Sequence, residues 1–573
     1  MTQKSVTVDE IMYIAAGYYH LKTADFHLNM TNPPLMKMLS ALPLLTLNLK
    51  MPSVQGDPQN WDLIDQWTYA RSFLYNNIAD ADKILFLARL PIVALSIILG
   101  GFVFLWTKGL YGDKAALFAL FLFSLSPNIL AHSRLATHDL GLTAFMFISS
   151  YYFWKYLSSP TTASILLCGL FFGCALLTKT TSLFLLPIFS IYALFCVWAN
   201  NGLGIHLKLP FAERVSEKRR QLRQTICIVS AFFIIVVVAI VILNIGYGFQ
   251  GSFRPITDHS SNIPLYRELR TSNLFTTGLL KWVFKIPLPF PLPYTEMIGF
   301  QSNLAADSGG VYFAGNIYDA GLWYLMILTF LLKSPIPLLL LFTASLCAMA
   351  VKAFRVGPEL FLLLFILVIM FVFSYLSKIN MGLRYVLPIY PFIHVLASRL
   401  LSLDFMRKPL FLGLFFALSA WYLLSSLLGY PHYLAYFNES IGGPTNGYKY
   451  LSDSNLDWGQ DLKGLKKYME ENHIPKIKLA YFGSADADYY GISYEYLPSV
   501  GLAPKRQGQY WWYEMDENHR HDPGPQKGYL AVSATLLASP GWMRPRFGKT
   551  YDWLKEYEPS DQIGHSILIF NIQ

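Results

Sequence analysis

Long apolar runs separated by short polar loops make up the middle of the chain. About ten of these runs are long enough to cross a hydrocarbon core of roughly 30 Å. They lie near residues 84–107, 114–132, 138–157, 162–178, 181–199, 224–247, 336–352, 359–377, 385–402 and 409–429. Ahead of the seventh run, Trp323 and Tyr324 suit a headgroup layer, and Pro335 and Pro337 would break a buried helix. We therefore expect an interfacial helix there that turns into the seventh run.

Polar sequence flanks the apolar region on both sides. The pattern predicts a first exoplasmic loop with amphipathic juxtamembrane helices, a polytopic α-helical membrane region with one long loop, and a soluble α+β domain. In that order, these are residues 1–83, 84–429 (long loop 248–320) and 430–573. In the last region, Asp457 precedes helical spacing over 460–472, and Trp553 lies in a second predicted helix. Strand-like runs lie at 476–482, 529–535 and 567–572.

The composition supports a membrane protein. Of the 573 residues, 14% are charged and 54% are hydrophobic, and the mean hydropathy is +0.37. A soluble globular chain carries about 25% charged residues. The net charge of +9 would suit a nucleic-acid partner, but the basic residues concentrate in short loops between apolar runs, the pattern that sets membrane orientation. We therefore expect no nucleic-acid binding.

The basic loops also predict the orientation. The loop at 200–223 is rich in Lys and Arg, so the positive-inside rule places it in the cytoplasm. Counting spans outward puts three further basic pairs on the same side, namely Lys108/Lys114, Lys352/Arg355 and Arg407/Lys408. Residues 1–83 and 430–573 then lie on the periplasmic or extracellular side of a bacterial plasma (inner) membrane.

This orientation has a consequence for the chain start. A crossing takes roughly 20 apolar residues, and no such run precedes Asp9. We expect the natural reading frame to continue upstream of Met1 and to encode one more hydrophobic helix. The bundle should then have an open groove beside the loop of Asp9.

Several ionisable residues fall at the predicted exoplasmic edge of the membrane. They are Asp9, Glu10, Lys37, Arg134, His138, Asp139, Lys179 and Arg384. Each has an ordinary explanation: Asp9 and Glu10 suit a solvated helix start, the lysines suit snorkelling, and Arg134 and Asp139 suit an ion pair that holds a turn. The positive-inside rule, however, predicts few cations on the exoplasmic side. Cations at this edge therefore favour an anionic ligand.

Group transfer from a lipid phosphate would use such a set. Cations at the headgroup level would hold the phosphate and stabilise it as it leaves. A carboxylate would take the proton from the attacking acceptor hydroxyl. A polar series in the soluble domain, Asp453, Asn455, Asp457 and Asp461, could instead suggest a cation loop. Trp458 and Gly464 occupy the places where an EF-hand needs Gly and Glu, so helix capping and turn formation explain the series better.

The set of charged residues resembles the GT-C glycosyltransferases, specifically the protein O-mannosyltransferase and aminoarabinose-transferase-like group (glycosyltransferase family 39 and relatives). The family motifs Asp-Glu, His-Pro-Pro-Leu-Gly-Lys, Arg-x-x-x-x-Asp and Gly…Lys are matched by Asp9-Glu10, Asn32-Pro33-Pro34-Leu35-Met36-Lys37, Arg134 to Asp139, and Gly173 with Lys179. Later segments are similar to a bacterial subgroup of phospholipid-carrier-dependent glycosyltransferases. They are Leu332-Lys333-Ser334-Pro335, Arg384-Tyr385-Val386-Leu387-Pro388 and Asp453 to Asp461.

The resemblance implies a function and assigns roles. Asp9 would be the catalytic base, supported by Glu10 and Asp139, in an inverting transfer from a polyprenyl-phosphate sugar to a hydroxyl on a glycan, lipid or protein. The expected donor-phosphate residues are Lys37, Arg134, Lys179, Lys333, Arg384 and Tyr385, with Asn32 and His138 in support. We expect no resident metal or cofactor, although a divalent metal is compatible with the set. Asn32 departs from the motif histidine, and the loop at 248–320 is too short for the β-trefoil domain of eukaryotic relatives.

Two other classes of function compete with this interpretation. A membrane transporter or lipid flippase would place charged sites near the bilayer midplane between inverted repeats. Here the charges line one face and no repeat is visible. A catalytically inactive relative that acts as an interaction module would not need the intact Asp9.

Overall fold

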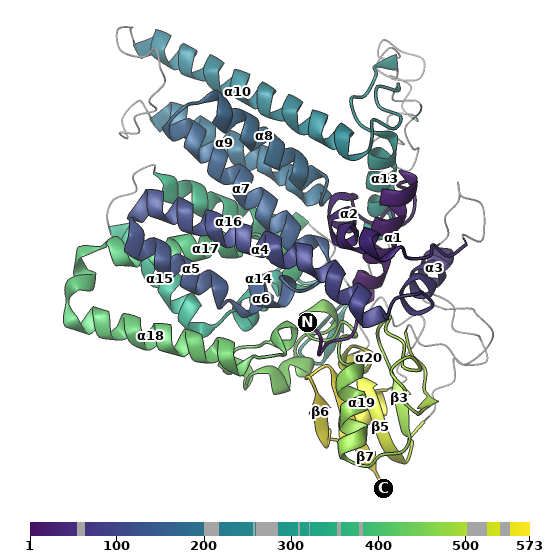
Figure 1. Cartoon of the computed structure of the whole chain (residues 1–573). Coiled ribbons are helices and arrows are strands. Elements are labelled where there is room, and N and C mark those ends of the chain that lie inside the picture. The colour runs from purple at the N-terminus through teal and green to yellow at the C-terminus, as the bar shows by residue number, and fades with distance from the viewer. Residues whose placement is uncertain are drawn as a thin grey trace.

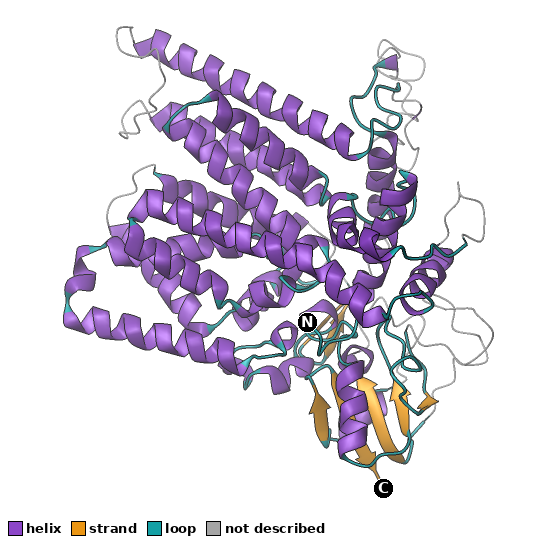
Figure 2. Ribbon diagram, in the orientation of Figure 1, coloured by secondary structure: helices purple, strands orange, loops and turns teal. Residues whose placement is uncertain are grey.

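The computed structural model has a bundle of long helices with a small mixed sheet at one end (Figures 1 and 2). It describes residues 1–53, 63–199, 217–255, 258, 285–306, 310–319, 321–351, 357–376, 382–500, 524–538 and 551–573. Most of the basic loop 200–223, the pair Lys352/Arg355 and part of the loop 248–320 lie outside the described residues.

The predicted apolar runs form the helices of the bundle. Their bounds are α4 (Ala81–Tyr111), α5 (Asp113–Ser124), α6 (Pro127–His132), α7 (His138–Ser158), α8 (Thr162–Leu176), α9 (Leu185–Ala199), α10 (Glu217–Gly246), α15 (Ile336–Val351), α16 (Pro358–Phe371), α17 (Ile389–Ser398) and α18 (Pro409–Leu428). Buried aromatic side chains fill the core between them; Trp106 of α4, for example, packs against Phe147 of α7 and Phe392 of α17. The chain is therefore a polytopic helical protein.

The span count differs from the predicted ten. By length and composition, five described helices could cross a membrane, or six if one bent pair is counted as a single span. Several predicted spans end early for identifiable reasons. Pro127 begins the separate helix α6 just after α5, and α8 and α17 are only 15 and 10 residues long. An apolar run in the sequence thus overestimates the length of the straight helix that it forms.

The bent pair lies where the sequence predicts a helix that turns into the seventh run. Helix α14 (Leu325–Lys333) meets α15 at an angle of 113°, and the bend falls at Ser334 and Pro335. Trp323 lies just before α14, half exposed, and stacks on Tyr375 with ring centroids 5.2 Å apart.

The N-terminal region folds against one end of the bundle (Figure 1). It contains α1 (Val8–Thr23), α2 (Leu35–Ala41) and α3 (Leu63–Tyr75), and α13 (Leu292–Ala306) lies beside α1 and α2. Helices α1 and α2 approach closely because Gly17 has no side chain: a Cβ there would lie 2.0 Å from the carbonyl oxygen of Lys37.

The C-terminal region is a five-stranded mixed sheet with strand order β4-β3-β5-β7-β6. Its strands are β3 (Ile477–Ala480), β4 (Tyr494–Tyr496), β5 (Gly528–Ser533), β6 (Asp561–Ile563) and β7 (Ile567–Ile572), and a separate hairpin pairs β1 (Val311–Phe313) with β2 (Asn316–Tyr318). Strand β3 pairs in parallel with β4 and β5, whereas β7 pairs antiparallel with β5 and β6. The expected C-terminal α+β region is present, with β3 and β7 inside the predicted runs and β5 beginning one residue before its run.

Two short helices complete this domain, α19 (Leu462–Glu471) and α20 (Ala534–Ala538). Helix α19 lies over one face of the sheet and buries Leu462, Leu465 and Met469, the apolar spacing seen in the sequence. Its N-cap is Asp461 rather than the predicted Asp457, because Asp457 accepts backbone N–H groups of Gly459 and Thr535 instead.

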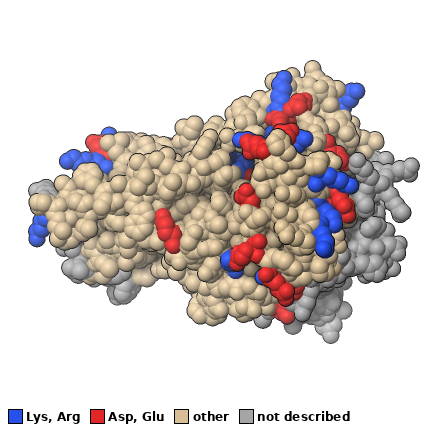
Figure 3. Space-filling model, turned by 90° about the horizontal axis from the view of Figure 1, so that it is seen from below, with Lys and Arg blue, Asp and Glu red and all other residues tan. Residues whose placement is uncertain are grey.

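Charged side chains are unevenly distributed over the surface. Figure 3 shows them gathered around the sheet end and at the far tips of the helices, with a broad uncharged surface between. Large apolar side chains such as Ile97, Phe233 and Leu410 are exposed on the helices in between. A wide exposed apolar surface on long helices is the signature of lipid contact, so the chain is a multi-pass membrane protein.

Candidate active site

Helix α1 carries the Asp-Glu pair, and the two carboxylates have different surroundings. Thr7 precedes the helix, and Glu10 accepts its backbone N–H at 2.9 Å and its hydroxyl at 3.0 Å. Glu10 is fully buried and also accepts from Arg89 of α4, at 2.6 and 2.8 Å, and from the N–H of Ala136 at 2.8 Å. Burial acts to raise the pKa of Glu10, but the charge of Arg89 and these hydrogen bonds hold it below its usual value. Glu10 therefore fixes the start of α1 while Asp9 faces elsewhere.

Asp9 is ion-paired to a residue from a distant part of the chain. Its Oδ2 accepts a hydrogen bond from Nη1 of Arg384 at 2.7 Å and one from the Tyr13 hydroxyl at 3.3 Å. Among the described residues, no group donates to Oδ1, and the Asp9 side chain is 24% exposed. One carboxylate oxygen is thus held in place while the other remains available as a proton acceptor.

Two successive hydrogen bonds connect Asn32 to Asp9 through the Tyr13 hydroxyl. Asn32 donates from Nδ2 to the Tyr13 oxygen at 3.2 Å, and Tyr13 in turn donates to Asp9. The His138 ring packs edge-on against Tyr13, with centroids 4.2 Å apart. Burial, together with the Asp9 charge, raises the pKa of the Tyr13 hydroxyl well above its usual range, so Tyr13 stays a proton donor. Asn32 and His138 therefore both contact the tyrosine that bonds to Asp9.

Arg384 lies in the 3₁₀ turn Leu383–Tyr385, between aromatic rings. Its guanidinium carbon is 4.6 Å from the centroid of the Trp458 ring and 5.6 Å from that of Tyr385. Such stacking holds the guanidinium plane while its N–H edges remain directed at an acceptor.

A second ion pair lies on the other side of Tyr385. Lys179 donates from Nζ to Oδ1 of Asp139 at 3.2 Å, and its Nζ is 4.1 Å from the centroid of the Tyr385 ring. Asp139, like Asp9, is the second residue of its helix, where the helix dipole favours a carboxylate. Tyr385 thus joins two carboxylate–cation pairs, Asp9–Arg384 and Asp139–Lys179.

Lys37 and Lys333, which were expected to contact the donor phosphate, instead donate hydrogen bonds to backbone carbonyls inside the protein. The Lys37 ammonium donates to the backbone carbonyls of Asn29 and Asn32, the second at 2.7 Å. Lys333 donates to the carbonyls of Leu434 and Asn455, at 2.7 and 2.5 Å. Both side chains are buried, so each cation braces a loop. Of the cations expected at the phosphate, Arg384 and Lys179 are the ones that the described contacts place beside Tyr385.

Arg134 also differs from expectation. It does not pair with Asp139: its Nη2 donates to the carbonyl of Pro431 at 2.5 Å, and its guanidinium lies 5.3 Å from the Tyr433 ring. Arg134 lines a separate small pocket, together with Met1, Lys4, Arg89, Ala131, Leu135, His432, Leu434, Ala435 and Gln460. The motif Arg-x-x-x-x-Asp therefore divides between two sites.

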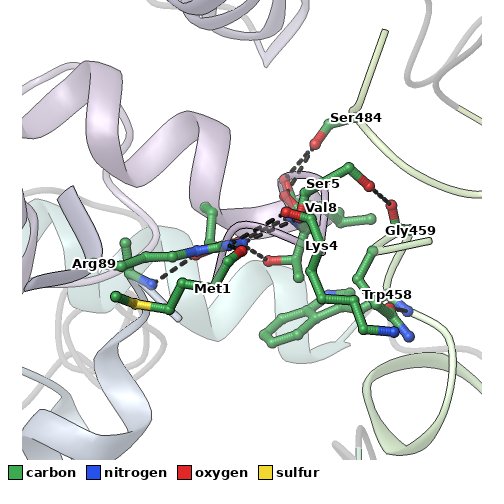
Figure 4. A network of polar contacts seen from close by, with 12 residues as sticks. Met1, Lys4, Ser5, Val8, Arg89, Trp458, Gly459 and Ser484 are labelled. Carbon is green, nitrogen blue, oxygen red and sulfur yellow. Dashed lines mark hydrogen bonds and ion pairs between the residues drawn. The ribbon is translucent and has the colours of Figure 1, made fainter. Parts of the chain in front are cut away.

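The segment before Asp9 is clamped between the bundle and the C-terminal domain (Figure 4). Arg89 donates to the carbonyls of Met1 and Ser5, each at 3.1 Å. On the other side, the N–H of Ser5 donates to Gln460 and that of Val8 to Trp458, both at 3.0 Å. Ser484 donates to the carbonyl of Thr7 at 3.0 Å. These contacts fix the position of the backbone that leads into Asp9.

Three residues of the site were not singled out in the sequence. Tyr13 lies four positions after Asp9, on the same face of a helix, which was a usable signal. Arg89 stands alone in an apolar run, which also marks a charge with a buried partner. Trp458 lies in the segment Asp453 to Asp461 that carries the family resemblance, but only the folded C-terminal domain brings it to Arg384.

One family model matches part of the chain. Residues 78–208 match the family model of the dolichyl-phosphate-mannose-protein mannosyltransferases. The family resemblance is confirmed for this segment. The matched segment, residues 78–208, contains Arg89, Arg134, Asp139 and Lys179. No curated protein sequence matches the chain.

Solved structures with a related arrangement are distant in sequence. ArnT from Cupriavidus metallidurans bound to undecaprenyl phosphate is 13% identical, with 99% of this chain and 94% of that chain covered and a TM-score of 0.43. Its apo state is 11% identical at the same coverage of 99% and 94%, with a TM-score of 0.44. The oligosaccharyltransferase AglB from Archaeoglobus fulgidus, in complex with an inhibitory peptide and a dolichol-phosphate, is 12% identical over 74% of this chain and 50% of that chain, with a TM-score of 0.40.

Proposed function

We propose that this chain is an integral membrane glycosyltransferase that moves a sugar from a polyprenyl-phosphate donor to an acceptor hydroxyl, with inversion and with Asp9 as general base. The observation that carries the proposal is the arrangement of Asp9: one oxygen is fixed by Arg384 and Tyr13, and the other accepts from no described residue. The match of residues 78–208 to a family named for a dolichyl-phosphate-linked sugar supports a lipid-phosphate donor.

The reaction needs one base and a stabilised leaving phosphate. Asp9 takes the proton of the acceptor hydroxyl as its oxygen attacks the anomeric carbon of the sugar. The bond between that carbon and the phosphate oxygen breaks, and its electron pair leaves with the polyprenyl phosphate. Attack opposite the departing phosphate inverts the anomeric centre. The reaction as proposed uses no resident metal or cofactor, because arginine supplies the positive charge.

Arg384 has two roles in this scheme. Without donor, its Nη1 is bonded to Asp9 at 2.7 Å. A donor phosphate, which matches the planar guanidinium fork, would compete for the same N–H groups. Phosphate binding would then weaken the hold on Asp9 and raise its ability to accept a proton. Lys179, held by Asp139 beside Tyr385, would add positive charge next to the leaving phosphate.

The acceptor and the side of the membrane are part of the proposal. Helix α1, which carries Asp9, lies at the same end of the bundle as the C-terminal domain (Figure 1). The basic loops of the sequence support a location of this end on the periplasmic or extracellular face of a bacterial inner membrane. The acceptor hydroxyl belongs to a glycan, a lipid or a protein that reaches this face.

A transporter or lipid flippase is the alternative. Such a protein would bind the same lipid phosphate but would leave the sugar–phosphate bond intact. Product analysis separates the two: a transferase releases free polyprenyl phosphate, whereas a flippase does not.

The test begins with the parent protein purified in mild detergent and mass spectrometry of the polyprenyl lipids that co-purify. Those lipids, with a labelled sugar, then serve as donors in a transfer assay. The Asp9→Asn variant should lose at least about a hundredfold in turnover, the usual weight of a positioned base, and should bind the donor as the parent does. Asp113→Asn, an exposed carboxylate next to Lys108, is the matched control and should keep full activity. Equal turnover in Asp9→Asn and parent would reject the assignment of the base.

A further inference from the structure

The C-terminal domain sends one loop, residues 452–460, to the turn that carries Arg384. Two side chains of this loop contact the turn. The Trp458 ring lies against the Arg384 guanidinium, and the Asn455 amide bonds to the backbone of Leu383. We propose that Trp458 is a positioning residue for Arg384, with Asn455 fixing the turn, so that the C-terminal domain completes the site. This inference rests on the proposed function for the role of Arg384.

Trp458 contacts Arg384 and the residue that precedes Asp9. Its ring centroid is 4.6 Å from the guanidinium carbon of Arg384. Its backbone carbonyl accepts the N–H of Val8, the residue before Asp9, at 3.0 Å (Figure 4). The side chain is 1% exposed, so it has few alternative positions. One residue of the C-terminal domain therefore sets the distance between the start of α1 and the Arg384 turn.

Asn455 holds the turn itself. Its Oδ1 accepts the N–H of Leu383 at 2.9 Å, and its Nδ2 donates to the carbonyl of Ser452 at 3.1 Å. Its own carbonyl accepts from Lys333 at 2.5 Å, so the cation that was expected at the phosphate instead secures this loop.

Gly382 allows this contact. It has φ +100°, a conformation that other residues rarely adopt, and a Cβ there would lie 2.6 Å from the amide atoms of Asn455. Because Gly382 has no side chain, the Asn455 amide can lie close to the backbone of the turn. An arginine on a loop loses side-chain freedom when it is stacked and its turn is bonded, which is the preorganisation that a phosphate site needs.

Trp458 also packs in an apolar cluster of the C-terminal domain, so a loss of activity on its removal could reflect only the fold. A double-mutant cycle separates the two roles, because a residue that acts through Arg384 has no further effect once Arg384 is gone. The four proteins are the parent, Trp458→Leu, Arg384→Ala and the double variant, and the measurement is kcat and KM with the labelled lipid donor.

We expect Trp458→Leu to lower kcat/KM about tenfold, the size of one desolvated cation–π contact. In the Arg384→Ala background the same change should cost less than about twofold. Trp458→Phe, which keeps an aromatic face, should recover most of the activity. Trp553→Leu in the same domain is the control and should leave kcat/KM unchanged. Additive losses in the cycle would overturn the inference.

Two further experiments test the inference if Trp458→Leu does not fold or if the proposed function is wrong. If Trp458→Leu does not fold, Asn455→Ala takes its place in the cycle, since it acts on the same arginine through Leu383. If the parent transfers no sugar, the proposed function fails. The positioning contact is then tested by the thermal midpoints of the same four proteins: non-additive shifts support it, and additive shifts reject it.

Discussion

Arg384 donates a hydrogen bond to Asp9 over 2.7 Å, although the two residues are 375 positions apart in the chain. Each belongs to a short element whose position is set by other contacts. Glu10 and Arg89 fix the start of α1, and Asn455 fixes the turn of Arg384. The pair therefore brings the N-terminal loop, the membrane bundle and the C-terminal domain together at one point.

Adjacent carboxylates should respond differently to removal of their charge. Glu10→Gln leaves Arg89 without its buried partner, a change that costs about 3–5 kcal/mol. The variant should therefore unfold at a markedly lower temperature. Asp9→Asn alters a partly exposed group and should shift the midpoint much less while it abolishes most turnover. Thermal unfolding and turnover measured on both variants check this; a Glu10→Gln protein as stable as the parent would contradict the structural role of Glu10.

The cations should also separate into two classes. Arg384→Ala should weaken binding of polyprenyl phosphate more than about tenfold, and Arg384→Lys should recover part of it, because lysine keeps the charge but loses the planar fork. Lys37→Ala should instead lower thermal stability, since its ammonium holds the loop of Asn29 and Asn32.

Native mass spectrometry of each folded variant with polyprenyl phosphate distinguishes these classes. A loss of lipid binding in Lys37→Ala as large as that in Arg384→Ala, at unchanged stability, would restore Lys37 to the phosphate site. Lys22→Ala, on the surface of α1, provides the control for a lysine that contacts neither loop nor site.

The ion pair between Asp139 and Lys179 gives a third prediction. Both side chains are largely buried, so Asp139→Asn or Lys179→Met alone leaves one charge uncompensated and should cost about 3–5 kcal/mol. The double variant removes both charges and should regain much of that stability without regaining full activity, because the cation beside Tyr385 is lost. Denaturation midpoints and kcat/KM of the three variants test this; full activity in the double variant would remove Lys179 from the phosphate site.

The sequence indicated the charged residues of the candidate site better than it indicated the residues that they contact. Asp9, Asp139, Lys179 and Arg384 are charges at the borders of apolar runs, where a charge is conspicuous. The partners of these charges could not be found in this way. Arg134 follows a recognisable motif yet bonds to Pro431, because the chain between α6 and α7 turns it away from Asp139.

The fold shows the same division between pattern and packing. The long apolar runs located the helices, and short apolar runs located β3, β5 and β7, because both are local features of the sequence. The loop that brings Trp458 to Arg384 depends on packing between distant segments. Distances of this kind have no local signature in a single sequence.

Asp457 gives a prediction for the dependence of stability on pH. It is fully buried in the C-terminal domain, and burial raises the pKa of its carboxyl to about 7, although the N–H groups of Thr535 and Gly459 act in the opposite direction. At low pH the carboxyl is protonated in both the folded and the unfolded chain. Above about pH 4 only the unfolded chain releases the proton, so the free energy of unfolding falls as the pH rises and reaches its full loss once the pH has passed about 7.

Asp457→Asn removes this titration and keeps the shape of the protonated side chain. The full effect of one group shifted this far is of order 4 kcal/mol, at about 1.4 kcal/mol per pKa unit. The midpoint of Asp457→Asn relative to the parent should therefore be several degrees higher at about pH 7.5 than at about pH 4.5. Taking the difference from the parent cancels the other titrating groups. Asp552→Asn, which removes a partly exposed carboxylate beside Lys555, should show a constant difference. A midpoint difference for Asp457→Asn that stays the same at both pH values would show that Asp457 is ionised in the folded chain throughout this range.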